Sequence, residues 1–148
     1  MNQQISKEYL KLPIGDIKGN DKNPKLHDDA LIKKSIDDLG YIEDIIVDED
    51  NIILSGHGRL KALIGLGYTD IEVVRVSGLT AKQKEKALLV LNKAVERGGW
   101  NDDLLKEFDR ALLADVGFDS KALDGLFATD EEAENAVPEA PVEPVAKL

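Results

Sequence analysis

The sequence contains no cysteine, which excludes disulfides, thiolate catalysis and zinc sites built on cysteine. No apolar run approaches the ~20 residues that a bilayer-spanning helix needs. The first residues, MNQQISKEYLKL, lack the basic-then-apolar pattern of a secretory signal. We therefore expect a cytoplasmic protein with no membrane contact.

An excess of basic residues is also missing, because the formal net charge is -10 at pH 7. Proteins that bind duplex DNA usually carry a basic excess, since neutralising phosphates supplies most of their non-specific affinity. We expect any DNA contact to come from a local patch or through a partner protein. Residues 130–148 hold six acidic residues and one lysine among alanines and prolines, without periodicity. This composition predicts a disordered tail at 129–148.

Hydrophobic periodicity predicts an α/β (α+β) protein with the order strand, helix, two strands, helix, strand and three helices. The runs at 10–17, 44–54 and 70–76 are typical of strands, and the second is typical of a hairpin. Thr80 and Gln83 form a capping box that predicts the start of a long helix. We expect a small mixed-sheet domain at 1–98, a helical extension at 99–128 and the tail. Two helical stripes are expected to be buried: Leu88, Leu91 and Val95, and then Leu105, Phe108, Leu112 and Val116.

The stretch NIILSGHGRLKAL, residues 51–63, joins an apolar strand to a helix expected from about Arg59. A strand that passes directly into a helix leaves free N–H groups at the positive end of the helix. Glycine allows positive φ and close approach of a ligand, and arginine offers a planar, bidentate donor. The pattern predicts an anion site, most often for phosphate, formed by Ser55, Gly56, His57, Gly58, Arg59 and Lys61.

Each of these residues also has a plainer explanation. Glycines in a strand-to-helix turn are often required only by the backbone conformation of the turn. A lone histidine usually has a structural role, and a lone arginine is usually exposed to solvent. The stretch matches neither the GxxxxGK[ST] phosphate loop nor GxGxxG, because position 61 is lysine. The occurrence of all these residues together, directly after an apolar strand, nevertheless favours the anion site.

Three ordered motifs resemble the ParB N-terminal-like domain of the ParB/sulfiredoxin superfamily over roughly residues 10–100. They are NPK in the loop at 23–25, SIDDLG at the helix end, and the Gly-x-x-Arg-x-x-Ala box through Gly56, Arg59 and Ala62. Residues 91–108 and 116–127 resemble the region that follows this domain in phage and mobile-element proteins, often upstream of a DNA methyltransferase domain.

The resemblance implies a ParB/sulfiredoxin-like fold and a pocket for CTP, ATP or ADP, with or without Mg²⁺. The helix start at Arg59 would grip the phosphates, and Asn23, Pro24 and Lys25 would form a facing loop. It implies a phage or mobile-element DNA-associated system in which binding, or weak hydrolysis, controls assembly of a homodimer or a partner complex. The family's Glu-Asn-x-x-Arg motif is altered, because Leu91 and Val95 flank Asn92 in place of Glu and Arg.

Two other functions stay open at this point. A small Mg-dependent nuclease or phosphotransferase could use the same pocket, with Glu43 or Asp44 as general base, although strand-start charges that face water explain both residues more simply. The acidic turn 48–50 is better explained as a solvated turn than as a metal site, so we predict no bound metal. The chain could also be a non-enzymatic interaction subunit of a DNA methyltransferase.

Overall fold

The computed structural model describes residues 4–128, and the predicted tail at 129–148 lies outside them. The chain forms two compact units that divide between Lys93 and Ala94, inside helix α3 (Ala81–Arg97). The predicted domain boundary after residue 98 stays a prediction. No helix between residues 4 and 128 combines the length and the apolar character needed to cross a membrane.

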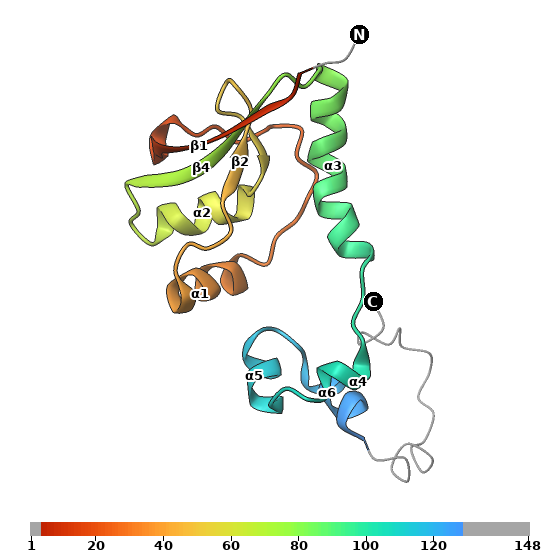
Figure 1. Cartoon of the computed structure of the whole chain (residues 1–148). Coiled ribbons are helices and arrows are strands. Elements are labelled where there is room, and N and C mark those ends of the chain that lie inside the picture. Colours follow the sequence, from red (N-terminus) through yellow and green to blue (C-terminus); the bar gives the residue numbers. More distant parts are fainter. Residues whose placement is uncertain (1–3, 129–148) are drawn as a thin grey trace. The chain divides into compact units, whose positions relative to one another are not determined.

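The first unit contains a four-stranded sheet in the order β1-β4-β2-β3 (Figure 1). The outer pairs are antiparallel and the central pair is parallel, so the sheet is mixed as predicted. Pro13 ends β1 at the sheet edge, where a residue without an N–H is tolerated. The strands are β1 (Ser6–Pro13), β2 (Ile45–Val47), β3 (Ile53–Ser55) and β4 (Asp70–Ser77).

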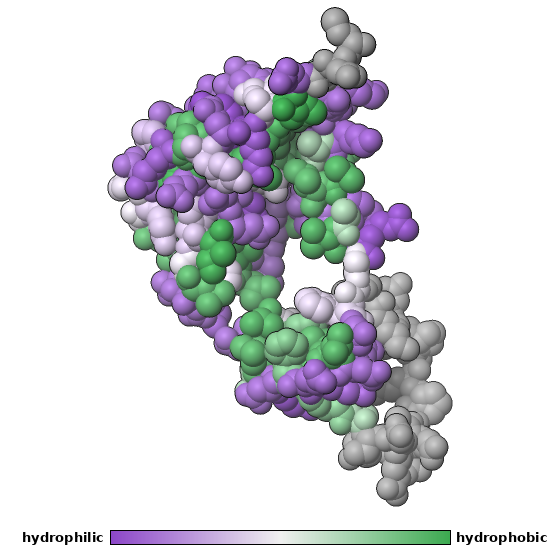
Figure 2. All heavy atoms as spheres, viewed as in Figure 1, coloured by the Kyte–Doolittle hydropathy of each residue, from purple (hydrophilic) through white to green (hydrophobic). Residues whose placement is uncertain are grey.

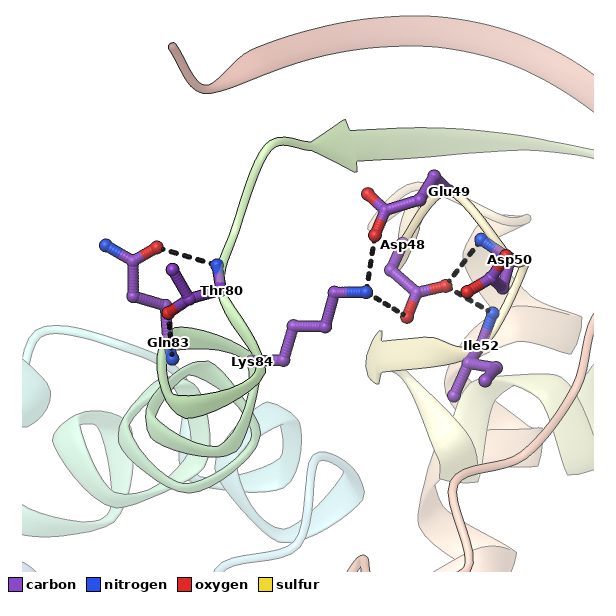
Figure 3. Close-up of polar contacts among 7 residues, drawn as sticks. All are labelled: Asp48, Glu49, Asp50, Ile52, Thr80, Gln83 and Lys84. Atoms are coloured by element: carbon purple, nitrogen blue, oxygen red, sulfur yellow. Dashed lines mark hydrogen bonds and ion pairs between the residues drawn. The ribbon is translucent and has the colours of Figure 1, made fainter. Parts of the chain in front are cut away.

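Local capping signals set the starts of the helices in this unit. Helix α1 (Asp29–Leu39) begins where Asp28 Oδ1 accepts the Leu31 N–H at 3.0 Å. Helix α3 begins at the predicted capping box. The Thr80 N–H donates to Gln83 Oε1 at 2.9 Å, and the Gln83 N–H donates to Thr80 Oγ1 at 3.1 Å (Figure 3). Helix α2 (His57–Gly65) starts differently, as described below.

The main core lies between one face of the sheet and helices α1 and α2, which lie together on that side (Figure 1). Alternate residues of a strand point to the same face, so Ile45 and Val47 of β2, and Ile71 and Val73 of β4, bury their side chains on this face. These residues and Ile53 of β3 pack with one side chain from the stretch between β1 and α1, one from α1 and two from α2. The buried cluster comprises Ile17, Ile36, Ile45, Val47, Ile53, Ala62, Leu63, Ile71 and Val73.

The predicted buried stripe on α3 is only partly correct. Leu88 is buried, but Leu91 is 41% exposed and Val95 is 80% exposed. Figure 2 shows apolar side chains, in green, at the surface along this helix. Periodicity identifies side chains that share a helix face, but it does not say whether another element covers that face.

The expectation that Leu105, Phe108, Leu112 and Val116 form a stripe on one helix is wrong, because the second unit contains two short helices there. Helix α4 (Asp102–Leu105) is capped by Asn101, and α5 (Arg110–Asp115) follows a turn. The turn shifts the helical register, so Leu113 is buried in place of the expected Phe108, Leu112 and Val116, which are exposed. Leu105 and Leu113 pack with Leu123 and Leu126 of α6 (Ser120–Phe127).

The turn between β2 and β3 is built around a buried carboxylate, which corrects the predicted solvated turn. Asp48 is 3% exposed, and its Oδ1 accepts the N–H groups of Asp50 at 2.8 Å and Ile52 at 3.0 Å (Figure 3). Its Oδ2 lies 3.2 Å from Lys84 Nζ, and Lys84 also pairs with Glu49. These contacts fix the hairpin turn and tie the first turn of α3 to it.

We predict that Leu63→Ala destabilises the protein by about 2–5 kcal/mol, because it leaves a cavity in the main core. Leu91→Ala should change the free energy of unfolding by no more than about 0.5 kcal/mol, since that side chain is largely exposed. Urea denaturation midpoints measure both changes. Equal losses in the two variants would show that the face of α3 at Leu91 is covered in solution.

We predict that Asp48→Ala costs about 3 kcal/mol, because it leaves two partly buried N–H groups without their side-chain acceptor and Lys84 without its buried partner. Glu49→Gln, which removes an exposed ion pair of the same lysine, should cost no more than about 1 kcal/mol. Urea denaturation of both variants at neutral pH provides the comparison. Similar small effects would mean that the hairpin turn does not depend on the Asp48 carboxylate.

Candidate anion-binding site

The strand-to-helix turn depends on Gly56, the N-cap residue of α2, which has φ = 117°. A Cβ at this position would lie 2.8 Å from Ile45 Cγ1 and 3.1 Å from Arg59 Nη2. Conformation and space therefore both require glycine. The helix begins at His57, two residues before the predicted start at Arg59, because the glycine reverses the chain at once.

The N-terminus of α2 carries no side-chain cap. The first N–H groups of a helix have no carbonyl partner within the helix and lie at its positive end. At the starts of the α-helices α1 and α3, the side chains of Asp28 and Thr80 accept such N–H groups. No side-chain cap therefore occupies the N–H donors in the first turn of α2.

A cavity of about 390 Å³ lies against this turn. Four predicted site residues line it: Ser55, Gly56, Gly58 and Arg59. The facing wall comes from α1 and from the segment that connects α1 to β2. The structure therefore brings half of the predicted anion-binding residues together around one cavity.

Arg59 lies at the cavity wall with its side chain 18% exposed. Its Nη2 donates to the Asp44 carbonyl oxygen at 3.3 Å, and its Nη1 lies 3.5 Å from Glu43 Oε2. The connecting segment thus holds the guanidinium in place. The Glu43 side chain is 80% exposed, so the ion pair is weak and open to competition from another anion.

The two candidate catalytic carboxylates have different positions. Both residues immediately precede β2, as predicted from the sequence. Glu43 lines the cavity and faces Arg59, whereas Asp44 contributes its backbone carbonyl to Arg59. Glu43 is therefore the carboxylate side chain in the lining of this cavity.

Four other predicted ligand residues have side chains outside the cavity lining. His57 Nε2 accepts the Asn20 N–H at 2.9 Å, so His57 holds the loop before α1. Lys61 Nζ lies 2.6 Å from Asp29 Oδ2. Asn23 Oδ1 accepts the Lys25 N–H at 3.3 Å, within the same loop. Successive helix residues point about 100° apart, which directs His57 and Lys61 away from the face of Arg59.

His27 lines the cavity, although the sequence pattern did not select it. Its Nε2 is buried without a hydrogen-bond partner in the described part of the chain. Burial lowers the pKa of His27, and the charge of Lys25 lowers it further. The only available signal was its place in the NPKLHDD stretch, two residues after the predicted facing loop.

Tyr41 also lines the cavity and fixes the connecting segment. Its hydroxyl donates to the Glu72 carbonyl at 2.6 Å and accepts the Ile45 N–H at 2.8 Å. Burial raises the pKa of this hydroxyl, so it stays protonated at neutral pH. Tyr41 thereby positions the segment that holds Arg59.

Asn92 of α3 completes the lining. Its Nδ2 donates to the Leu88 carbonyl at 3.1 Å, as in many helix interiors. The neighbouring departures from the Glu-Asn-x-x-Arg pattern, Leu91 and Val95, are exposed apolar residues. Asn92 is therefore the residue of that pattern that lines the cavity.

We predict that the free energy of unfolding falls as the pH drops below about 6.5, the ordinary imidazole value. Burial lowers the pKa of both His27 and His57, so below that pH the unfolded chain binds protons that the folded chain does not. Urea denaturation at about pH 7.5 and about pH 5.5 measures the effect. The difference should shrink in His27→Gln. Stability that stays flat or rises on acidification would show that neither ring is held neutral.

No protein-family profile matches the chain. A curated relative from Escherichia coli strain K12, the ParB-like nuclease domain-containing protein YnaK, is 31% identical over 85 residues. The match covers 53% of this chain and 98% of that protein.

Solved structures of low sequence identity show the same fold. The C-terminally truncated chromosome-partitioning protein ParB from Caulobacter crescentus, complexed with CTP-γ-S, has a TM-score of 0.57 at 17% identity, and the match covers 94% of this chain and 96% of that chain. A pNOB8-like ParB N-domain has a TM-score of 0.54 at 20% identity over 69% of this chain. The chain spans 40% of that protein and 36% of a second structure of the pNOB8-like ParB N-domain. With the mixed sheet and the extent of the YnaK match, these findings place the chain in the family of ParB-like N-terminal domains.

Proposed function

We propose that the chain binds a nucleotide through its phosphates in the cavity at the start of α2. One observation carries the proposal. The cavity is lined by the residues of an uncapped helix N-terminus and by an arginine that neighbouring backbone holds at its wall. The N–H groups and the guanidinium are donors suited to phosphate oxygens.

The size and the composition of the cavity support a small-molecule ligand. A volume of about 390 Å³ falls within the usual range for ligand pockets, roughly 300–1,000 Å³. The lining combines apolar residues such as Ile32 and Leu39 with a few polar groups, including Ser55 and Asn92. The ParB from Caulobacter crescentus, which shares the fold, was solved with CTP-γ-S, so a cytidine nucleotide is the first candidate, followed by ATP and ADP.

Phosphate binding requires Arg59 to exchange its present partner. The phosphate competes with Glu43, whose ion pair with Arg59 is worth no more than about 1 kcal/mol because the carboxylate is exposed. The hydrogen bond from Arg59 to the Asp44 carbonyl can remain and orient the guanidinium. The free-energy cost of releasing Glu43 when phosphate binds is therefore small.

We further propose that nucleotide binding, with weak hydrolysis at most, controls assembly of a homodimer or a partner complex in a DNA-associated system of a phage or mobile element. Leu91 and Val95 replace the charged residues of the Glu-Asn-x-x-Arg pattern, which favours binding over turnover. The net charge of -10 favours DNA contact through a partner protein.

We predict that Arg59→Ala weakens nucleotide binding at least about 10-fold, because it removes charge-assisted hydrogen bonds to phosphate. Isothermal titration calorimetry with CTP, ATP, ADP and GTP, with and without Mg²⁺, measures the affinity. Lys61→Ala is the matched control. This lysine is also on α2, but it pairs with Asp29 outside the cavity lining, so affinity should stay within about 2-fold of the unmodified chain, since an exposed ion pair contributes little.

The folded state of Arg59→Ala is verified by urea denaturation. Equal affinity in Arg59→Ala and the unmodified chain would contradict the phosphate role of Arg59. Failure of the unmodified chain to bind any of the four nucleotides would contradict the proposal as a whole.

Product analysis with Mg²⁺ distinguishes binding from catalysis. Nucleotide hydrolysis, phosphate transfer or nicking of plasmid DNA that Glu43→Gln abolishes would replace the binding function with an enzymatic one, since Glu43 is the carboxylate beside Arg59. Binding without any product supports the proposal as stated.

A further inference from the structure

His27, in the loop before α1, packs directly on the first turn of α2. A Cβ atom added to Gly58 would lie 3.0 Å from His27 Cγ and 3.2 Å from His27 Cβ, so the ring side of His27 rests on this backbone. His27 also lines the same cavity as Arg59. The loop therefore places an imidazole beside the donors proposed to hold phosphate.

Two residues that line this cavity each have a side-chain nitrogen that is buried and unpaired in the described part of the chain: Nε2 of His27 and Nε of Arg59. A buried polar atom without a partner is uncommon, and one on a residue that lines a cavity has hydrogen-bonding capacity left for a ligand. The other histidine differs. His57 Nε2 accepts the Asn20 N–H at 2.9 Å and is satisfied without a ligand.

The charged groups around His27 come from three segments. Burial, Lys25 of the same loop and Arg59 of α2 favour the neutral ring, whereas Asp29 of α1 favours the charged ring. His57 of α2 also lies within electrostatic range of His27. Glu43 is the exposed carboxylate at the cavity. An anion bound in the cavity would add negative charge beside the ring and favour its protonation.

We propose that His27 is a ligand-contacting residue of the nucleotide site and donates a hydrogen bond from Nε2 to a phosphate oxygen held at the first turn of α2. This inference rests on the proposed function. Under this proposal, His27 gains a proton when phosphate binds. The affinity for phosphate therefore rises as the solution becomes more acidic. Arg59 then supplies the permanent charge of the site and His27 the charge that depends on pH.

Two substitutions of His27 distinguish the contribution of its hydrogen bond from the contributions of its ring shape and its charge. His27→Phe keeps a ring against Gly58 but has no donor. His27→Gln keeps a donor near the position of Nε2 but cannot become charged. Calorimetry with CTP and ATP should show about a 10-fold loss of affinity in His27→Phe, as expected for a lost hydrogen bond to a charged group. His27→Gln should keep most of the affinity and lose the extra increase that the unmodified chain shows on acidification.

NMR of the unmodified chain gives an independent measurement, because the chain has two histidines, His27 and His57. The imidazole ¹⁵N signals report protonation and tautomer for each ring. Addition of CTP, ATP or inorganic phosphate should shift the His27 signals toward the protonated form. His57, whose Nε2 is occupied by Asn20, should keep its tautomer and serves as the internal control.

The possible outcomes separate this inference from the proposed function. Binding of CTP or ATP with unchanged His27 signals, and equal affinity in His27→Phe, would overturn the role of His27 and leave the nucleotide site standing. Absence of binding in the unmodified chain would overturn both. If His27→Phe does not fold, the ¹⁵N titration of the unmodified chain decides the question alone.

Discussion

The close contact of Gly56 with Ile45 and Arg59 is the constraint on which the site depends. The positive φ of Gly56 lets β3 pass into α2 without an intervening loop, and the missing side chain leaves room for the guanidinium. Any other residue would push Arg59 or β2 away and would strain the turn. One backbone position therefore fixes the direction of α2 and the placement of Arg59.

The parts of the fold that depend on local chemistry could be predicted from the sequence. The hairpin around residues 45–55, the Thr80–Gln83 capping box and the glycine at the end of α1 each follow from a few neighbouring residues. The strand core follows from alternation, since Ile71 and Val73 must face the same side. The strand-to-helix turn at residues 55–59 was also recognisable as a candidate anion site, because its glycines and arginine lie close together in the sequence.

The remaining features depend on which distant segments meet, and no local pattern contains that information. The cavity wall takes His27, Tyr41 and Asn92 from a loop, a connecting segment and a helix. Asp48 looked like one of three solvated acids, yet it is buried because Lys84, far along the chain, pairs with it. Periodicity likewise placed Leu91 correctly on a helix face but gave no sign of whether that face is covered.

A net charge of -10 is compatible with a cavity that is proposed to bind an anion. Net charge is a sum over the ionised side chains of the whole chain, whereas the start of α2 combines one arginine with backbone dipoles that the sum omits. Exposed acids more than about 8–10 Å away are screened by physiological salt, while Arg59 and the first turn of α2 are in direct contact with the cavity. Glu43 is the acidic side chain paired with Arg59, and it is exposed enough to turn toward water if an anion takes its place. The local field of the cavity, and not the sum of charges over the chain, therefore decides which ligands it selects.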